Sequence, residues 1–447
     1  MLKGKWPEIT LQYLLCVLAF LIPFPYIFSA ICIGIILILW LLAVNYKDLV
    51  ANLSKRRVIW AWIVYFLLHV VSYSYSRNKA QSAFDLQSKL SIFFLPVVIG
   101  AGTRLNRRII ERIFFYFNIS VTVIGLYCIY HATERTLNEG YIYKPFFFYN
   151  DLVDGLDASA VYMAWYTLIS MSAMFFIDWK YYYKNNYKWL KILLLIFQII
   201  FFILLSARTL LLVFFVVVVP YYIYITFKHT RLRLWQKLSA GAIFLILATA
   251  LLVTNNPVKK RFGDLYQKNL DIAWQNDYSH IPQKEFSNLT LRLMVWRMGI
   301  ENMNEHHLWL TGAGNGDVQD LQNQKMAAYG IDVYNPDASK RSEFYNLNLH
   351  NMALESLMML GIPGLILFLF IIFAPFFLIR KIELKNIFIL FNVIAFSFFF
   401  QEAAFQTQAG IIYYTFFTAI LINIYYTHSD RELNEPEQLM LMKTKNI

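Results

Sequence analysis

Three side chains in this sequence carry strong hydrogen-bonding groups in or beside apolar stretches, namely Arg208, Arg292 and His350. An arginine held against an apolar surface usually binds an anion or packs against a partner side chain. A histidine at a membrane interface can stay partly hydrated and titrate near neutral pH. These residue types therefore suggest anion binding together with a group that can take up a proton.

Arg208 lies in an almost continuously apolar run, residues 190–227. One helix of that length would be about 57 Å long at 1.5 Å per residue, whereas the hydrocarbon core of a bilayer is about 30 Å thick. The run must therefore break, and its one polar cluster is Ser206-Ala-Arg208-Thr209. We expect a tight outward hairpin with Arg208 at its tip; the alternative is an interface arginine that only snorkels towards water.

Arg292 lies in a segment with helical periodicity, residues 289–303. It projects beside an apolar stripe, so we expect it to hold an anion or a packed partner, and Arg297 lies at the flank of the stripe. The alternative is an ordinary flanking arginine of an amphipathic loop helix. A period of 3.6 residues places five side chains on the stripe, namely Leu289, Leu293, Trp296, Ile300 and Met303.

His350 and Asn351 open a long apolar stretch, which places the histidine at the outer membrane interface. Glu355 follows Asn351 by about one helical turn, so their shared face carries a carboxylate into the membrane. Acidic residues inside a membrane are functional candidates by default, although polar packing between helices would also explain this one.

Other clusters give no metal or nucleotide site. Adjacent histidines on a helix point about 100° apart and no His-Glu-x-x-His motif is present, so we expect no zinc. A glycine-rich segment at 312–316 lacks the Lys-Ser/Thr pair of a phosphate-binding loop and is expected to be a tight turn. The remaining candidates are an aspartate group explained by a solvated loop face (Asp151, Asp154 and Asp157) and the scattered histidines His280, His306 and His307.

The composition indicates which elements must position these residues. Of the 447 residues, 58% are hydrophobic, 18% aromatic and 15% charged, whereas a soluble domain carries about 25% charged residues. A bilayer accepts apolar side chains on every face of a helix, so an integral membrane protein is expected. The cysteines Cys16, Cys32 and Cys128 all fall in apolar runs, so we expect no disulfide framework. The first apolar run has no convincing cleavage site, and no cleavable signal peptide is expected.

Twelve apolar runs approach the length of a membrane span, which predicts an all-α integral membrane fold. The fourth is short and the tenth is long, so we expect tilt, kinking or a misplaced boundary there. The predicted spans are residues 9–24, 26–45, 58–75, 89–102, 109–130, 158–177, 189–205, 209–226, 238–254, 350–379, 386–402 and 409–426.

The net charge of +12 is explained by topology rather than by nucleic-acid binding. Five basic loops lie on the side of the N-terminal Lys3 and Lys5, and an excess of positive charge marks the cytoplasmic side. We therefore expect both termini in the cytoplasm. The loops centre on residues 47–57, 104–108, 180–188, 228–237 and 380–385.

The outer side keeps three segments, of which residues 255–349 form the largest. This loop has ten Lys/Arg against eleven Asp/Glu and three tryptophans, so we expect it to fold, in part as helix. The other two outer segments are 76–88 and 131–157. The predicted organisation is spans 1–9 over residues 1–254, the loop over 255–349, spans 10–12 over 350–426, and a cytoplasmic tail over 427–447.

In this order on a twelve-span chain, the three sites resemble the O-antigen ligase/polymerase superfamily of bacterial envelope enzymes. Arg208-Thr-Leu-Leu-Leu212 is similar to the family's Arg-x3-Leu signature. Leu291-Arg292-Leu-Met-Val-Trp296, followed by Leu310-Thr-Gly312-Ala-Gly314, resembles its loop pattern. His350-Asn351 with Gly361 and Gly364 fits a ligase-associated His-Asn-x9-Gly-x2-Gly pattern in full. The resemblance covers about residues 190–375.

The resemblance implies an inverting, metal-independent transfer of a glycan from undecaprenyl diphosphate to an acceptor such as lipid A–core, on the periplasmic face of the inner membrane. Arg208 and Arg292 would hold the diphosphate, because the arginine fork matches phosphate oxygens. His350 would accept the proton of the acceptor hydroxyl. Arg297, Asn351 and Glu355 are the further expected substrate-binding residues. We expect no cofactor, and membrane lipids are the remaining partners.

Several alternatives stay open. A polymerase of the same superfamily would extend the glycan by repeat units, although the complete histidine motif favours a ligase. A ligase with a protein or another surface acceptor is a third variant. A transporter would require two related halves with interrupted helices, and no such internal symmetry is present.

Overall fold

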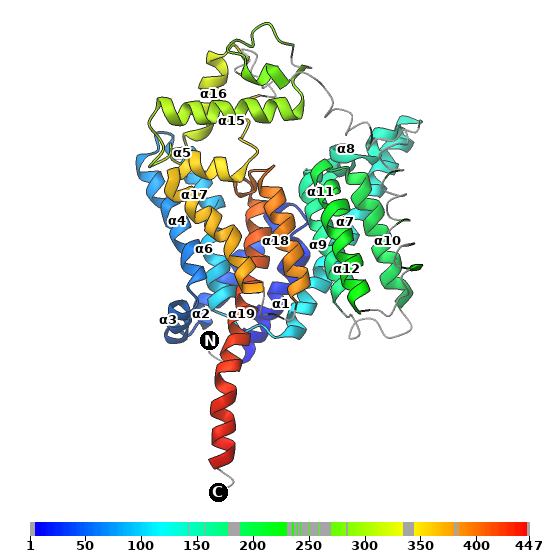
Figure 1. Ribbon diagram of the computed structural model, residues 1–447, viewed down its shortest axis with the longest axis vertical. Helices are drawn as coiled ribbons and strands as arrows, with labels where there is room; N and C mark the ends of the chain where they lie inside the picture. Colours follow the sequence, from blue (N-terminus) through cyan, green and yellow to red (C-terminus); the bar gives the residue numbers. More distant parts are fainter. Residues whose placement is uncertain are drawn as a thin grey trace.

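The computed structural model describes residues 5–141, 143–156, 158–177, 188–229, 270–282, 285–333, 344–379 and 384–444, and between these ranges also 235–236, 239, 242, 249, 259 and 382. The elements in these ranges are helices, most of which run side by side in one bundle (Figure 1). The predicted ninth span, residues 238–254, lies outside the described residues apart from three single positions.

The first part of the bundle consists of helices that follow the predicted apolar runs, together with short helices in segments that were predicted as connections. In chain order they are α1 (Lys5–Leu21), α2 (Tyr26–Ala43), α3 (Tyr46–Lys55), α4 (Val58–Tyr75), α5 (Lys79–Ser88), α6 (Leu90–Leu95), η1 (Pro96–Ala101), α7 (Arg107–Glu139), η2 (Lys144–Phe147), α8 (Tyr149–Val153), η3 (Asp154–Leu156), α9 (Ala160–Phe176), α10 (Lys188–Leu205), α11 (Arg208–Val213), η5 (Phe214–Val218) and α12 (Val219–His229).

The second part adds the helices of the segment that was predicted as the outer loop, followed by the last helices of the bundle. They are η7 (Leu270–Trp274), α15 (Asn288–Glu305), α16 (Val318–Ala328), α17 (Met352–Leu378), α18 (Lys385–Phe399), η10 (Ala404–Gln406) and α19 (Gln408–Thr444).

Seven helical stretches of the described chain are long and apolar enough to cross a membrane, or eight if the bent pair of α8–η3 with α9 is one span. Three shorter apolar helices, Trp6–Leu21, Trp189–Leu205 and Lys385–Phe399, coincide with three more of the predicted spans. The chain is therefore a multi-pass helical membrane protein, and the total of twelve spans stays a prediction.

The fourth predicted span begins at a different residue in the structure, whereas the tenth nearly keeps its predicted limits and has the kink that was expected for it. The fourth, predicted from residue 89, begins ten residues earlier, because α5, α6 and η1 form one apolar stretch from Lys79 to Ala101. The charges that made residues 76–88 look like an outer segment include Asp85, which pairs with the buried Lys89 at 3.3 Å. The tenth is broken, since Gly361 inside α17 has φ 68° and ψ −165°.

Aromatic side chains on one face of α18 pack this helix against α9 and α19. Trp165 of α9 stacks on Phe398 of α18 with ring centroids 4.2 Å apart. Two turns earlier on the same face, Phe391 of α18 stacks on Tyr414 of α19 at 5.6 Å. Stacked aromatic pairs add to the stability that burial of their large apolar area provides. The connection that follows α18 is thereby held in place.

The outer unit, which we define as η7, α15 and α16, lies across one end of the bundle (Figure 1). The start of α1, helix α3 with its basic residues, and the end of α19 lie at the opposite end (Figure 1). This separation agrees with a loop on one side of the membrane and the termini on the other.

The apolar stripe predicted on α15 is only partly correct. Of its members Met303 is buried, whereas Leu289 is 37% exposed and Trp296 is half-buried. The face that is buried instead carries Met294, Met298 and their neighbours. The reason is tertiary, because α15 packs against both η7 and α16 within the outer unit.

The outer unit is attached to the bundle at the break in α17. Gly312, with φ 69°, lies so close to the backbone of Met359 and Leu360 that an added Cβ would be 2.4 Å from their atoms. A Cβ on Gly361 would be 2.5 Å from the carbonyl of Leu310. Glycine is therefore required on both sides. The contact satisfies backbone groups freed by the break, since the amides at 313, 314 and 362 bond carbonyls across it at 2.7–3.0 Å.

Candidate active site

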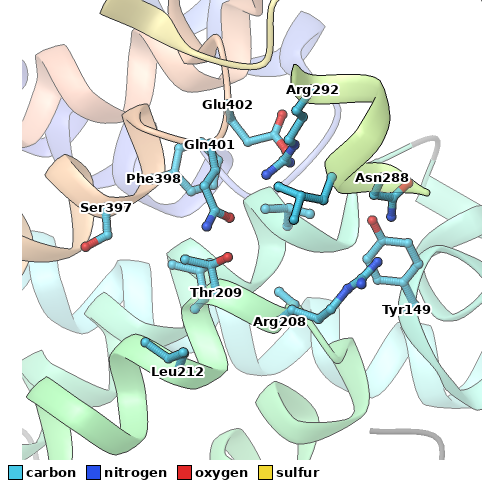
Figure 2. Close-up of a pocket in the computed structure, with 14 residues that line it drawn as sticks. Tyr149, Arg208, Thr209, Leu212, Asn288, Arg292, Ser397, Phe398, Gln401 and Glu402 are labelled. Atoms are coloured by element: carbon cyan, nitrogen blue, oxygen red, sulfur yellow. The ribbon is translucent and has the colours of Figure 1, made fainter. Parts of the chain in front are cut away.

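A pocket of about 320 Å³ lies between the outer unit and the ends of α8, α9, α11 and α18. Figure 2 shows polar side chains of the lining that come from α8, α11, α15, α18 and the connection after α18. Its lining comprises Tyr149, Val161, Ala207, Arg208, Thr209, Leu210, Leu212, Asn288, Leu289, Arg292, Ser397, Phe398, Gln401 and Glu402.

Arg208 lies where the sequence predicts a break in the apolar run. Helix α10 ends at Leu205, Ser206 turns the chain with φ 48°, and Arg208 is the first residue of α11. Its side chain extends along the pocket towards the ring of Tyr149 (Figure 2). Tyr149 also has a left-handed backbone (φ 55°), which is unusual for a residue other than glycine.

Arg292 reaches the pocket from the opposite side, because α15 lies across the end of the bundle. Its Nη2 is 3.2 Å from Oε1 of Glu402, and the two side chains are 25% and 17% exposed. Glu402 belongs to the connection after α18, where its N–H donates to the carbonyl of Phe398 at 2.8 Å. The ion pair therefore joins the outer unit to the membrane helices.

His350 does not line the pocket itself but contacts its rim through Glu402. Its Nδ1 is 3.3 Å from Oε2 of Glu402. A carboxylate can only accept a hydrogen bond, so Nδ1 carries the proton in this contact and Nε2 is left as the basic nitrogen. His350 has φ 45°, a left-handed conformation that costs about 1–3 kcal/mol and is often found at functional sites.

The structure thus brings three predicted residues to one pocket and its rim. Arg208 and Arg292 line one pocket, and His350 shares the Glu402 carboxylate with Arg292. The arrangement offers two guanidinium groups for an anion and a carboxylate-oriented imidazole beside them. Chemically it can bind a phosphate group and accept a proton at its edge.

Asn351 and Glu355 lie apart from the pocket. Asn351 caps α17, since its side-chain oxygen accepts from the amides of Ala353 and Leu354 at 3.0 and 3.1 Å. Glu355 is fully buried, and its Oε2 accepts from the amide of Leu349 at 3.2 Å. Both residues hold the chain on either side of His350.

Arg297 points into the outer unit. Its Nε donates to Glu301 at 2.7 Å and its Nη1 to the carbonyl of Gln275 at 2.9 Å, while its guanidinium lies 5.3 Å from the ring centroid of Tyr329. Burial lowers the pKa of Arg297, but the hydrogen bond and charge of Glu301 outweigh this effect and raise it overall. These contacts connect α15 to its neighbours in the outer unit.

Glu402 is the main residue that sequence reasoning missed. It lies 110 positions after Arg292 and 52 after His350, so no spacing rule connects them. One signal was present, because Glu402 is the one charged residue of the predicted span 386–402. Tyr149 and Asn288 gave no such signal, since both lie in polar or aromatic surroundings.

Comparison with known proteins found a match to a protein-family model. No match was found among curated proteins. Residues 193–369 match the family model described as O-antigen ligase. The matched segment contains Arg208, Arg292 and His350, together with the glycines at the break in α17, and ends before Glu402. This match to residues 193–369 supports the O-antigen ligase-like superfamily for the chain.

Proposed function

We propose that this protein transfers a glycan from undecaprenyl diphosphate to a hydroxyl group of lipid A–core or a related surface acceptor. The reaction would take place at the outer face of the bacterial inner membrane. The observation that carries the proposal is the convergence of Arg208 and Arg292 on one pocket whose rim holds the Glu402–His350 pair.

The diphosphate would lie between the two arginines. They enter the pocket from opposite sides, one from the end of a membrane helix and one from the outer unit (Figure 2). Guanidinium groups bind phosphate oxygens with paired hydrogen bonds, and a pocket of about 320 Å³ is within the range of small-molecule sites. The outer unit would in this way close over the donor headgroup.

The lipid part of the donor would follow α11 into the bilayer. Leu212 lies one turn beyond Arg208, lines the pocket and is 53% exposed on the surface of a helix long enough to cross the membrane. On α18 Ser397 and Phe398 line the same side. The lining therefore includes apolar side chains beside the arginines, as a polyprenyl diphosphate requires.

These positions suit an inverting transfer. The oxygen of the acceptor hydroxyl would attack the anomeric carbon from the side opposite the diphosphate, so that a new glycosidic bond forms and the configuration is inverted. The bond from the anomeric carbon to the diphosphate oxygen breaks, and the diphosphate keeps the electron pair. Nε2 of His350 takes the hydroxyl proton. The arginines stabilise the charge that develops on the leaving group, which is commonly the larger contribution to catalysis.

Glu402 would serve both halves of this reaction. By accepting from Nδ1 it orients the imidazole and stabilises the imidazolium that forms, as the acid of a catalytic triad does. By pairing with Arg292 it keeps the arginine at the pocket. We assign Arg297, Asn351 and Glu355 to the framework that supports these groups, because their contacts lie within the outer unit or beside His350.

Deletion of the gene followed by analysis of cell-surface glycolipids tests the proposal. Loss of all long chains from lipid A–core, with accumulation of the lipid-linked polymer, is the expected result. A single repeat unit left on the core would instead identify a polymerase. Unchanged glycolipids with altered glycoproteins would identify a protein acceptor, and no change in any glycoconjugate would contradict the proposal.

A further inference from the structure

We infer that Trp296 is a positioning residue that holds the His350 backbone in register with Arg292. The inference rests on the proposed function, in which His350 takes the acceptor proton. Trp296 lies one helical turn after Arg292 on α15, and its Nε1–H donates to the carbonyl of Leu349 at 2.6 Å. The indole ring contacts Phe400 edge to face, with centroids 5.9 Å apart.

This hydrogen bond acts on the peptide group next to His350. The carbonyl of Leu349 and the amide of His350 belong to one planar unit. Trp296 binds the oxygen of that unit, and Oδ1 of Asn348 accepts from its N–H at 2.8 Å. Because hydrogen bonds hold both the carbonyl and the amide of this peptide group, the group cannot rotate freely. Its orientation sets the left-handed φ of His350.

Two separate routes of contacts link Arg292 and His350, the two groups that would act on the substrate. In the first route, the side chain of Glu402 contacts both the guanidinium of Arg292 and the imidazole of His350. In the second route, Trp296, which lies on α15 like Arg292, donates to the carbonyl of Leu349, the residue before His350. One helix of the outer unit therefore holds both the expected diphosphate ligand and the backbone of the expected base.

Through the second route Trp296 has a role besides packing, which is to position the backbone of His350. A strained backbone persists only where its surroundings determine it, so loss of the indole hydrogen bond would let the imidazole turn away from Glu402 and the acceptor. Small displacements of a catalytic group can lower a rate by up to about 10²-fold. Donor binding would be unaffected, because both arginines keep their own contacts.

The test is Trp296→Phe, which removes the N–H and keeps an aromatic ring against Phe400. The transfer rate of purified protein at saturating donor and acceptor should fall about tenfold, with the donor KM unchanged within twofold. Trp309→Phe is the matched control, since Trp309 of the same region donates to Asn304 at 3.0 Å, away from the pocket. The control should keep the wild-type rate.

A double-mutant cycle separates positioning from a general loss of structure. If Trp296 acts through the orientation of His350, then Trp296→Phe should cost less than about threefold when added to Glu402→Ala, which removes the side chain that the imidazole contacts. A full tenfold loss in both backgrounds, or a wild-type rate for Trp296→Phe alone, overturns the inference. If the wild-type protein transfers no glycan, the proposed function fails and the inference fails with it.

Discussion

Helix α15 carries two arginines on different faces, and the two arginines have partners of different kinds. Arg292 and Arg297 are five positions apart, which places them about 140° apart around the helix. Arg297 pairs with Glu301 of its own helix at 2.7 Å, whereas Arg292 pairs at 3.2 Å with Glu402, which comes from another part of the chain. A local partner can form as soon as the helix does. A distant partner exists only in the assembled protein, and here it faces a pocket.

The ion pairs of Arg297 and Arg292 differ in which parts of the protein they join. Arg297, Glu301, Lys325 and Tyr329 form one network whose members all lie in the outer unit. Arg292 and Glu402 join the outer unit to the membrane helices next to a pocket that also receives Arg208. The first network stabilises the unit, and the second brings groups together that a substrate can use.

Arg292→Ala should have the largest effect. It removes one of the two expected diphosphate ligands and leaves Glu402 without its arginine, so we predict a loss of transfer of at least about 10³-fold at unchanged membrane abundance. The measurement is glycan transfer by the purified variant, with Arg297→Ala beside it. Equal losses for the two variants would remove the distinction between the two faces.

Glu402→Gln should follow with a loss of about 10²-fold. The amide keeps the shape of the side chain but cannot stabilise the imidazolium. The variant should also bind the lipid-linked donor at least as well as the wild type, because a negative charge leaves the diphosphate pocket. Donor binding and turnover are measured separately, and a variant with unchanged turnover would show that Glu402 has no part in the reaction.

Arg208→Lys should cost about tenfold in transfer rate. Lysine keeps the positive charge at the start of α11 but loses the fork that matches two phosphate oxygens. The loss should appear in donor KM as well as in the rate, whereas Glu402→Gln changes the rate alone. A wild-type rate for Arg208→Lys would indicate that only charge is needed at this position.

Arg297→Ala should have the smallest effect on transfer, within about threefold, and should instead destabilise the outer unit by about 1–3 kcal/mol. Limited proteolysis within the outer unit measures this change. Cleavage at the wild-type rate together with loss of transfer would reverse the roles given to the two faces.

The same network predicts how the outer unit responds to acid. Burial raises the pKa of Glu301, but hydrogen bonds from Tyr329 and Arg297 outweigh it and lower the pKa below its ordinary value of 4.5. The stability that this carboxylate provides is therefore complete above about pH 4.5 and is lost as pH falls through the lower folded-state value. Proteolysis followed over this range should show a weaker pH response in Arg297→Ala, because part of the lowering comes from Arg297.

Much of the fold could be predicted because membrane helices follow from apolar length. The break before Arg208 was predictable for the same reason, since one helix through residues 190–227 would be too long. The start of the fourth span was not, because the pairing of Asp85 with the buried Lys89 hides charges that the sequence presents as hydrophilic. The break at Gly361 depends on the turn that packs against it, a contact between distant segments.

The site was predictable only in its individual members. Arg208, Arg292 and His350 are each polar residues in or beside apolar stretches. The glycine spacing after His350 is a further signal for that residue. Their meeting point was not predictable, because Glu402 is far from each of them in sequence. Glu355 and Arg297 were expected at the substrate since they are charged in unusual places, and the structure gives each of them a partner elsewhere.

The most direct test uses purified protein in liposomes with a lipid-linked glycan donor and a lipid A–core acceptor, comparing the wild type with His350→Ala. The wild type should form a glycolipid whose new bond has the anomeric configuration opposite to that of the donor. His350→Ala should form at least about 10²-fold less product while remaining folded and binding the donor. Near-normal transfer by His350→Ala, or no transfer by the wild type, would contradict the account.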